Sequence, residues 1–264
     1  MAAMTETLVS EKNPLLKQVR RAVARGTLTE DGYAVAEGFH LLEEALSSDC
    51  EIRAVIVAES VKSTVSTHIR GLKRTRLAAI PDKLFDELAS TDAPQGVIAL
   101  VRPPVWTLDQ LLRGKALVMV LDGVQDPGNA GAILRAGEAF GASGAAFLKG
   151  TVSPYNPKGV RASAGSLFRL PVVAALDESL FLAALDQKRI ALYAAMPRAS
   201  KMMGEANFSE RCAIVIGGEG RGVSPQVQAR ATGVKIPTSG VESLNAAVAA
   251  GVLLYEARRQ RSVS

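Results

Sequence analysis

Cysteine and histidine are scarce in this chain of 264 residues, which has two of each. Cys50 and Cys212 lie far apart, and neither has a partner at a spacing typical of a metal site or a redox pair. A disulfide-stabilised scaffold and a metal centre are therefore not expected. The pattern predicts two reduced, buried thiols in a cytoplasmic protein.

Long apolar stretches and aromatic side chains are also few. Met1–Asn13 is polar and mixed in charge, so no secretory signal is expected. The longest apolar run, Ala246–Tyr255, is too short to span a bilayer, which predicts a buried helix and no membrane segment. Aromatic residues make up 5% of the chain against 48% hydrophobic residues, so the cores must consist mainly of Ala, Val, Leu and Ile.

An excess of basic residues gives a formal net charge of +5 and an isoelectric point near 9.3, which favours a polyanionic partner. Asn13-Pro14 is a typical helix start, with Asn as N-cap and Pro at the first helical position. The helix that follows places its basic side chains together opposite its apolar face: Lys17, Arg20, Arg21 and Arg25. This pattern is equally typical of a solvated surface and of a phosphate-binding surface. A second basic cluster comprises Arg70, Lys73, Arg74 and Arg76.

Short apolar segments alternate with helical ones along the whole chain, which predicts an α/β protein. In the first part, strands are expected at Tyr33–Ala36, Ile52–Val57, Leu77–Ile80 and Val97–Val101, and helices at Phe39–Leu46 and Asp82–Leu88. Arg102-Pro103-Pro104-Val105 then marks a domain boundary. We therefore expect a first domain over residues 1–102, a linker over 103–107 and a second domain over 108–264.

The second domain begins with a nearly continuous apolar segment, Ala116–Leu121, typical of a strand buried on both faces of a parallel sheet. Further strands are expected at Ala145–Leu148, Ile190–Ala194, Ala213–Ile216 and Val234–Ile236, and a last helix at Ala246–Arg261. These spacings predict a largely parallel sheet.

Three segments of this domain share one pattern, in which a buried strand is followed by a polar, glycine-bearing loop and a helix. They are Leu121–Arg135, Ile216–Pro225 and Ile236–Asn245. Glycine lets the backbone approach a ligand closely, and a helix N-terminus favours negative charge. The first loop lacks the G-x-G-x-x-G pattern, so a nicotinamide-dependent oxidoreductase is not supported.

Taken together, the three loops resemble the SpoU, or TrmH-like, branch of the SPOUT methyltransferases. The resemblance rests on Asn129-x5-Arg135, on Gly217-Gly218-Glu219-Gly220-Arg221-Gly222, and on Ile236-Pro237 followed by Glu242-Ser243-Leu244-Asn245. Many members have Asn where this chain has Gly218. Less specific matches are Ala36–Leu41 and Thr91–Val97 in the first domain. The intermediate stretch Arg161–Ser166 also fits.

The resemblance implies a C-terminal α/β trefoil-knot domain and a smaller N-terminal α/β domain like ribosomal protein L30e that binds RNA. It implies methyl transfer from S-adenosylmethionine to a ribose 2′-hydroxyl, in 23S-type ribosomal RNA or, alternatively, in tRNA. A catalytically silent RNA-binding protein with this fold is a further alternative. The family is also homodimeric through its C-terminal domain, with a catalytic arginine contributed across the interface.

Site residues follow from matching positions. Those expected to contact the cofactor are Gly217, Gly218, Gly222, Ile236, Pro237 and Leu244; those expected to take part in catalysis are Arg135, Asn129, Glu219, Ser243 and Asn245. RNA contacts are expected from Lys17, Arg20, Arg21, Arg25, Arg74 and Arg161. A guanidinium has a pKa above about 12 and is a poor base, so we expect Arg135 to bind a phosphate or to stabilise the developing oxyanion.

Overall fold

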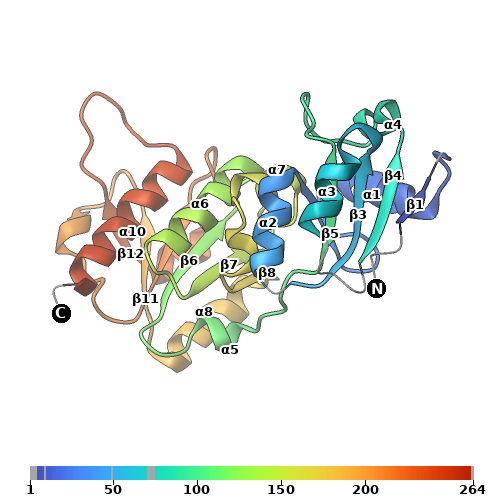
Figure 1. Cartoon of the computed structure of the whole chain (residues 1–264). Coiled ribbons are helices and arrows are strands. Elements are labelled where there is room, and N and C mark those ends of the chain that lie inside the picture. Colours follow the sequence, from blue (N-terminus) through green and yellow to red (C-terminus); the bar gives the residue numbers. More distant parts are fainter. Residues whose placement is uncertain (1–4, 9, 49, 70–74, 263–264) are drawn as a thin grey trace. The chain divides into compact units, whose positions relative to one another are not determined.

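The computed structural model describes residues 5–8, 10–48, 50–69 and 75–262 (Figure 1). By internal contacts the chain forms two compact units. The first runs up to Pro104 and also includes Tyr155–Arg169; the second comprises Val105–Pro154 and the chain from Leu170 onward. Among the described residues, no helix is long and apolar enough to cross a membrane.

The first unit is built on a mixed five-stranded sheet with the order β1-β4-β3-β5-β2. Strands β1, β4 and β3 run parallel to one another, and β5 is antiparallel to both of its neighbours. Its elements are β1 (Thr5–Thr7), α1 (Pro14–Arg25), β2 (Ala34–Glu37), α2 (Phe39–Ser47), β3 (Ile52–Ala58), η1 (Glu59–Val61), α3 (Lys62–His68), β4 (Arg76–Ile80), α4 (Asp82–Asp86), β5 (Val97–Val101), α7 (Pro157–Ala162) and η2 (Ser166–Phe168).

The expected first helix is confirmed, and its boundaries have a local cause. The Asn13 side chain accepts a hydrogen bond from the backbone N–H of Leu15 at 2.9 Å, and Gly26 ends the helix in the left-handed conformation with φ 62°. The buried face includes Leu16 and Val19, which pack with residues of the sheet in one apolar core.

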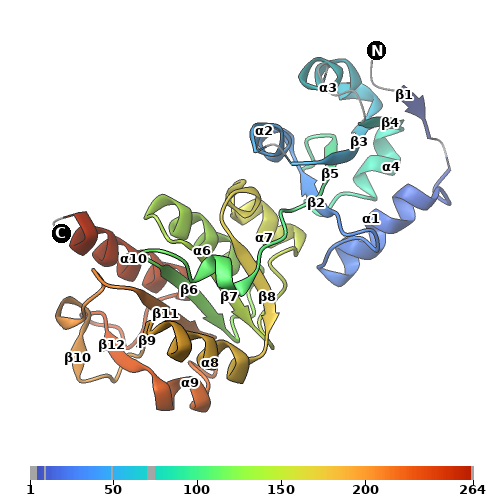
Figure 2. The same cartoon turned by 90° about the horizontal axis from the view of Figure 1, so that it is seen from below.

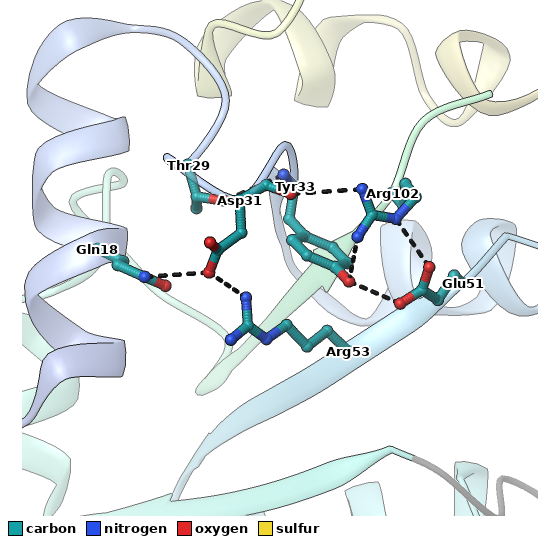
Figure 3. A network of polar contacts seen from close by, with 7 residues as sticks. All are labelled: Gln18, Thr29, Asp31, Tyr33, Glu51, Arg53 and Arg102. Atoms are coloured by element: carbon teal, nitrogen blue, oxygen red, sulfur yellow. Dashed lines mark hydrogen bonds and ion pairs between the residues drawn. The ribbon is translucent and has the colours of Figure 1, made fainter. Parts of the chain in front are cut away.

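A polar network joins α1, the loop before β2, strand β3 and the end of β5 (Figure 3). The buried Tyr33 hydroxyl donates to Glu51 at 2.6 Å, and Arg102 donates to Glu51 at 2.7 Å while its guanidinium lies 4.2 Å from the Tyr33 ring centroid. Arg53 pairs with Asp31 beside the same ring. Burial raises the pKa of Tyr33, and its bond to Glu51 raises it further. The network fixes Arg102, the residue directly before the two prolines.

The second unit contains a seven-stranded sheet with the order β10-β12-β9-β11-β6-β7-β8, in which every pairing is parallel. Its elements are α5 (Leu108–Leu111), β6 (Leu117–Asp122), α6 (Pro127–Ala139), β7 (Gly144–Leu148), β8 (Val172–Leu176), α8 (Glu178–Lys188), β9 (Ala191–Ala195), β10 (Lys201–Met202), η3 (Met203–Glu205), β11 (Cys212–Gly217), α9 (Pro225–Arg230), β12 (Thr232–Lys235) and α10 (Ala246–Ser262).

Helices cover both faces of this parallel sheet, as such sheets require. Figures 1 and 2 show α6 and α10 side by side on one face, with α5, α8 and α9 on the other. The expected strands of both units are confirmed to within one or two residues at their ends, with one correction: β12 ends at Lys235, so Ile236 already lies in the following loop. Strands β1, β8 and β10 were not expected from the sequence.

The C-terminal end of α10 is bonded to the segments that precede strands β6 and β11. Arg261 donates to the carbonyl oxygens of Phe208 at 2.7 Å and Ala116 at 3.0 Å, and its Nη2 lies 3.7 Å from the Cys212 sulfur. Cys212 is buried, and burial raises the pKa of its thiol to about 11, although the nearby guanidinium opposes the shift.

We expect Cys212 to make stability fall as the pH rises above about 9. The unfolded chain releases the thiol proton near its ordinary pKa of 9.0, whereas the native state retains it up to about 11, so deprotonation favours unfolding within this window. Urea unfolding at pH 8, 9 and 10 gives the free energy of unfolding of the wild type and of Cys212→Ala. This free energy should fall more steeply with pH in the wild type. An equal dependence on pH in the two proteins would contradict the prediction.

Candidate functional site

The loops at the carboxyl ends of the central strands meet where the chain changes direction across the sheet. From β6 the chain proceeds through β7 to β8 on one side, while β11, β9, β12 and β10 lie on the other. In open α/β sheets, ligands bind at such a switch point, outside the carboxyl ends of the strands.

A cavity of about 600 Å³ lies at this edge, between the loops after β9, β11 and β12 and the start of α10. Its walls include five of the six residues expected to contact a cofactor, namely Gly217, Gly218, Gly222, Ile236 and Leu244. Pro237 is not among the lining residues. Three of the expected catalytic residues, Glu219, Ser243 and Asn245, also line the cavity, whereas Asn129 and Arg135 do not.

A chain of side-chain hydrogen bonds joins the three loops. Asn129, in the first turn of α6, donates to Glu219 at 2.5 Å and accepts from Asn245 at 3.0 Å. Asn245 in turn accepts from the backbone N–H of Ala247 at 2.9 Å, and so caps α10. One amide thus connects the loops after β6, β11 and β12. Asn129 contributes to the cavity through its two partners.

Glycine is required at two positions of the second loop for steric reasons. A Cβ on Gly217 would lie 2.2 Å from the carbonyl carbon of Gly222, and one on Gly218 would lie 2.3 Å from the carbonyl oxygen of Gly123. The backbone N–H of Gly218 donates to the carbonyl oxygen of Asp122 at 2.9 Å. The side chain often found at position 218 in the family therefore has no room in this chain, and the backbone itself forms the wall.

Asp122 was not identified from the sequence, although it ends the apolar strand β6. Its carboxylate is 7% exposed and accepts from the backbone N–H of Ser224 at 2.7 Å. The Ser224 hydroxyl donates to Glu178 at 2.6 Å. These contacts fix the far end of the glycine-rich loop. The sequence pattern that could have identified Asp122 is an acidic residue at the end of a buried strand.

Arg135 lies six residues after Asn129, on a different side of α6, because six residues correspond to well over one and a half helical turns. It is exposed and makes no hydrogen bond or ion pair with any residue that the structure describes. The structure of the single chain therefore does not bring Arg135 to the cavity. At the cavity rim, in contrast, Arg198 forms an unexpected ion pair with Glu242 at 2.9 Å.

The residues expected to contact RNA lie in the first unit. Lys17, Arg21 and Arg25 are exposed and Arg20 is half-buried; Arg21 pairs with Glu30 at 2.9 Å. Arg74, with Arg70 and Lys73, lies outside the described residues. Arg161 is only 28% exposed and lies beside Glu37. In the described ranges, no cluster of His, Cys, Asp or Glu has the arrangement of a metal site.

The steric role of Gly218 leads to a stability prediction. In Gly218→Ala the methyl group must displace the backbone of Gly123, and overpacking of this kind costs about 1–3 kcal/mol. Gly220→Ala is the matched control, because a Cβ there meets no atom within 4 Å. Urea denaturation should show a lower free energy of unfolding for Gly218→Ala alone. Equal losses in the two variants would contradict the assigned packing.

Two family models match the chain. The SpoU rRNA methylase family matches residues 116–255, and the MRM3-like substrate binding domain matches residues 13–99. An uncharacterized tRNA/rRNA methyltransferase of Synechocystis, slr1673, is 33% identical and aligns with 97% of this chain and 94% of its own length. The 23S rRNA (guanosine(2553)-2′-O)-methyltransferase RlmP of Bacillus subtilis is 29% identical over 94% of this chain and 98% of its own.

Solved structures agree with the sequence comparisons over nearly the whole chain. The SpoU methyltransferase AviRb of Streptomyces viridochromogenes, in complex with its cofactor AdoMet, superposes with a TM-score of 0.87 at 29% identity and covers 95% of this chain and 99% of its own. An RNA 2′-O ribose methyltransferase superposes with a TM-score of 0.81 at 32% identity, and covers 97% of this chain and 100% of its own. The chain belongs to the SpoU rRNA methylase family.

Proposed function

We propose that the protein transfers a methyl group from S-adenosylmethionine to a ribose 2′-hydroxyl of 23S-type ribosomal RNA in the cytoplasm. The observation that carries this proposal is the cavity of about 600 Å³ enclosed by the three glycine-bearing loops. Relatives aligned over most of the chain are named as 23S rRNA 2′-O-methyltransferases, which supports the target.

The cavity fits S-adenosylmethionine in size and in chemistry. Its volume lies within the range of about 300–1,000 Å³ that is usual for small-molecule sites. Gly217, Gly218 and Gly222 form a backbone wall, free of side chains, on which an adenine can lie closely, and Ile236 and Leu244 offer apolar contact. Pro237 would restrict the backbone next to Ile236. The carboxylates of Glu219 and Glu242 suit a positively charged sulfonium.

The bound cofactor supplies an activated methyl group, so the protein's own residues mainly align the reactants, exclude water and manage one proton. Asn129 holds Glu219 and Asn245 in place, and the exposed Ser243 can bond the incoming nucleotide. In this proposal Arg135 stabilises the developing oxyanion or binds the adjacent phosphate, because a guanidinium offers several hydrogen-bond donors and a positive charge.

The proposal includes a homodimer and the trefoil knot implied by the family. The outer face of α10 exposes Val248 (51%) and Tyr255 (58%), at the helical spacing of a single stripe, and Tyr255 packs edge-on against Phe140 beside α6. A second copy docked on this face would cover the stripe. It would also explain Arg135, which has no partner among the described residues of its own chain but would serve the cavity of the partner subunit.

Ribosomal RNA is favoured over tRNA by the extent of the chain. A structure described in terms of 2-OH methylation of C/U34 on tRNA covers only 57% of this chain but 99% of its own, so much of this chain has no counterpart in it. Mapping 2′-O-methylation in RNA from cells with and without the gene tests the target directly. Loss of a methyl group from tRNA alone would contradict it.

Arg135→Ala should reduce kcat by about 10²–10³-fold, the usual effect of removing one oxyanion-stabilising donor. The affinity for S-adenosylmethionine, measured by calorimetry, should stay unchanged, because in this proposal Arg135 acts on the RNA oxyanion or phosphate and not on the cofactor. The oligomeric state should stay unchanged as well, because the proposed interface is the apolar stripe of α10. Arg135→Lys should recover part of the activity, since it retains the charge. Normal turnover of Arg135→Ala would contradict the assigned role.

Val248→Glu should convert the homodimer into a monomer, because it places a charge within the apolar stripe of α10. Val105→Glu is the control, since Val105 is 90% exposed and lies outside α10. Sedimentation velocity distinguishes the two masses. A dimeric Val248→Glu variant, or a monomeric wild type, would contradict this interface.

A further inference from the structure

Three motifs of the sequence that the catalytic cavity does not use meet at a second cavity, within the first unit. This cavity has a volume of about 280 Å³ and is lined by Glu37, Gly38, His40, Leu41, Thr91, Ala93, Gln95 and Arg161. The lining residues come from the end of β2, the start of α2, the loop before β5 and α7. They include residues of three stretches that resemble the family, Ala36–Leu41, Thr91–Val97 and Arg161–Ser166.

Glu37 lies in the wall of this cavity and is held in place by hydrogen bonds. Its side chain is 3% exposed, and it accepts hydrogen bonds from the backbone N–H of Ser90 at 2.9 Å and from the Ser90 hydroxyl at 2.6 Å. The Thr91 hydroxyl and Arg161 bind the same carboxylate, the latter at 3.5 Å. A buried carboxylate requires hydrogen-bond partners, and these contacts hold Arg161 in a defined position.

Hydrogen-bond donors remain available at the cavity wall. Arg161 uses only Nη1 toward Glu37 and Ser90, so its Nε and Nη2 make no hydrogen bond with the described residues. Gln95 accepts from the backbone N–H of Phe39 at 3.0 Å through its oxygen, which leaves its amide N–H groups without a partner in the described part of the chain. The free edge of Arg161 is a planar pair of donors, which matches the paired acceptors of a nucleobase or a phosphate.

We propose that this cavity binds a single unpaired nucleotide of the RNA substrate, outside the nucleotide stack. The proposal rests on the function proposed above and adds a recognition site in the first unit. The cavity is just below the usual size range of about 300 Å³ and more for small-molecule sites, which suits one nucleotide. Sequence-specific RNA recognition depends mainly on such unstacked bases, bound by donors and by apolar side chains. Leu41 and Ala93 supply the apolar contact here.

The two histidines of the chain provide a direct binding assay that needs no methyl transfer. His40 lines the cavity and its side chain is 62% exposed, whereas His68 is not among the lining residues. In NMR titrations of the full chain, the ring signals of His40 should shift with the four nucleoside 5′-monophosphates, and those of His68 should shift less. Inorganic phosphate is titrated separately. No shift of His40, or an equal shift with phosphate alone, would overturn the proposal.

A variant that fills the cavity tests its role in the reaction. Ala93 is exposed at the cavity wall, so Ala93→Trp blocks the space without removing a hydrogen bond; Ser63→Trp adds the same bulk to the exposed side of α3. Ala93→Trp should abolish the His40 shift and raise the KM for in vitro transcribed 23S rRNA roughly tenfold, a factor equal to about 1.4 kcal/mol. Its kcat and its affinity for S-adenosylmethionine should change less than about twofold, and Ser63→Trp should behave as wild type.

The outcomes separate the two proposals. If wild type methylates RNA and Ala93→Trp does so with an unchanged KM, the nucleotide site is wrong and the proposed function stands. If wild type methylates no RNA while His40 still responds to nucleotides and not to phosphate, the binding site stands and the proposed function is wrong.

Discussion

The proposed active-site end of the second unit depends on one amide group, that of Asn129. Its oxygen and nitrogen are both used, one toward Asn245 and the other toward Glu219, so a single side chain sets the spacing of three loops that are far apart in the sequence. An amide is suited to this because it donates and accepts at the same time and carries no charge. A carboxylate in its place could not donate to Glu219 and would repel it.

Close contacts between backbone segments determine the shape of the loops that Asn129 joins. Gly217 and Gly218 lie against the backbone of Gly222 and Gly123, and the buried Asp122 holds the end of the same loop through Ser224. Backbone walls of this kind bind through shape and through fixed N–H and C=O groups. They cannot supply a mobile charged group, which explains why the proposed chemistry needs a guanidinium from elsewhere.

Charged side chains have two distinct arrangements in the first unit, one paired around a buried side chain and the other exposed. Around Glu37, a buried carboxylate fixes Arg161, and around Tyr33, two arginines and two carboxylates surround one aromatic ring (Figure 3). The basic stripe of α1, in contrast, stays exposed to solvent. The unit thus combines positioned donors with a diffuse positive surface. Nucleic-acid binding uses both, positioned donors for specificity and diffuse charge for affinity.

The sequence by itself determined the α/β class, most strands, the capped first helix and the glycine-bearing loops, because these depend on local patterns. Apolar periodicity places a strand, and Asn13-Pro14 or Gly26 places a helix end, whatever the rest of the chain does. It missed β1 and β10, which have three and two residues and no continuous apolar run, so their pairing with neighbouring strands defines them. It also missed β8, although Val172–Leu176 is a continuous apolar run. Only the tertiary structure decided that Asp122 holds the loop, that Arg135 faces away from its own cavity and that Arg161 joins Glu37 in the first unit. Each of these depends on which distant segments the sheets bring together, and spacing along the chain does not encode that distance.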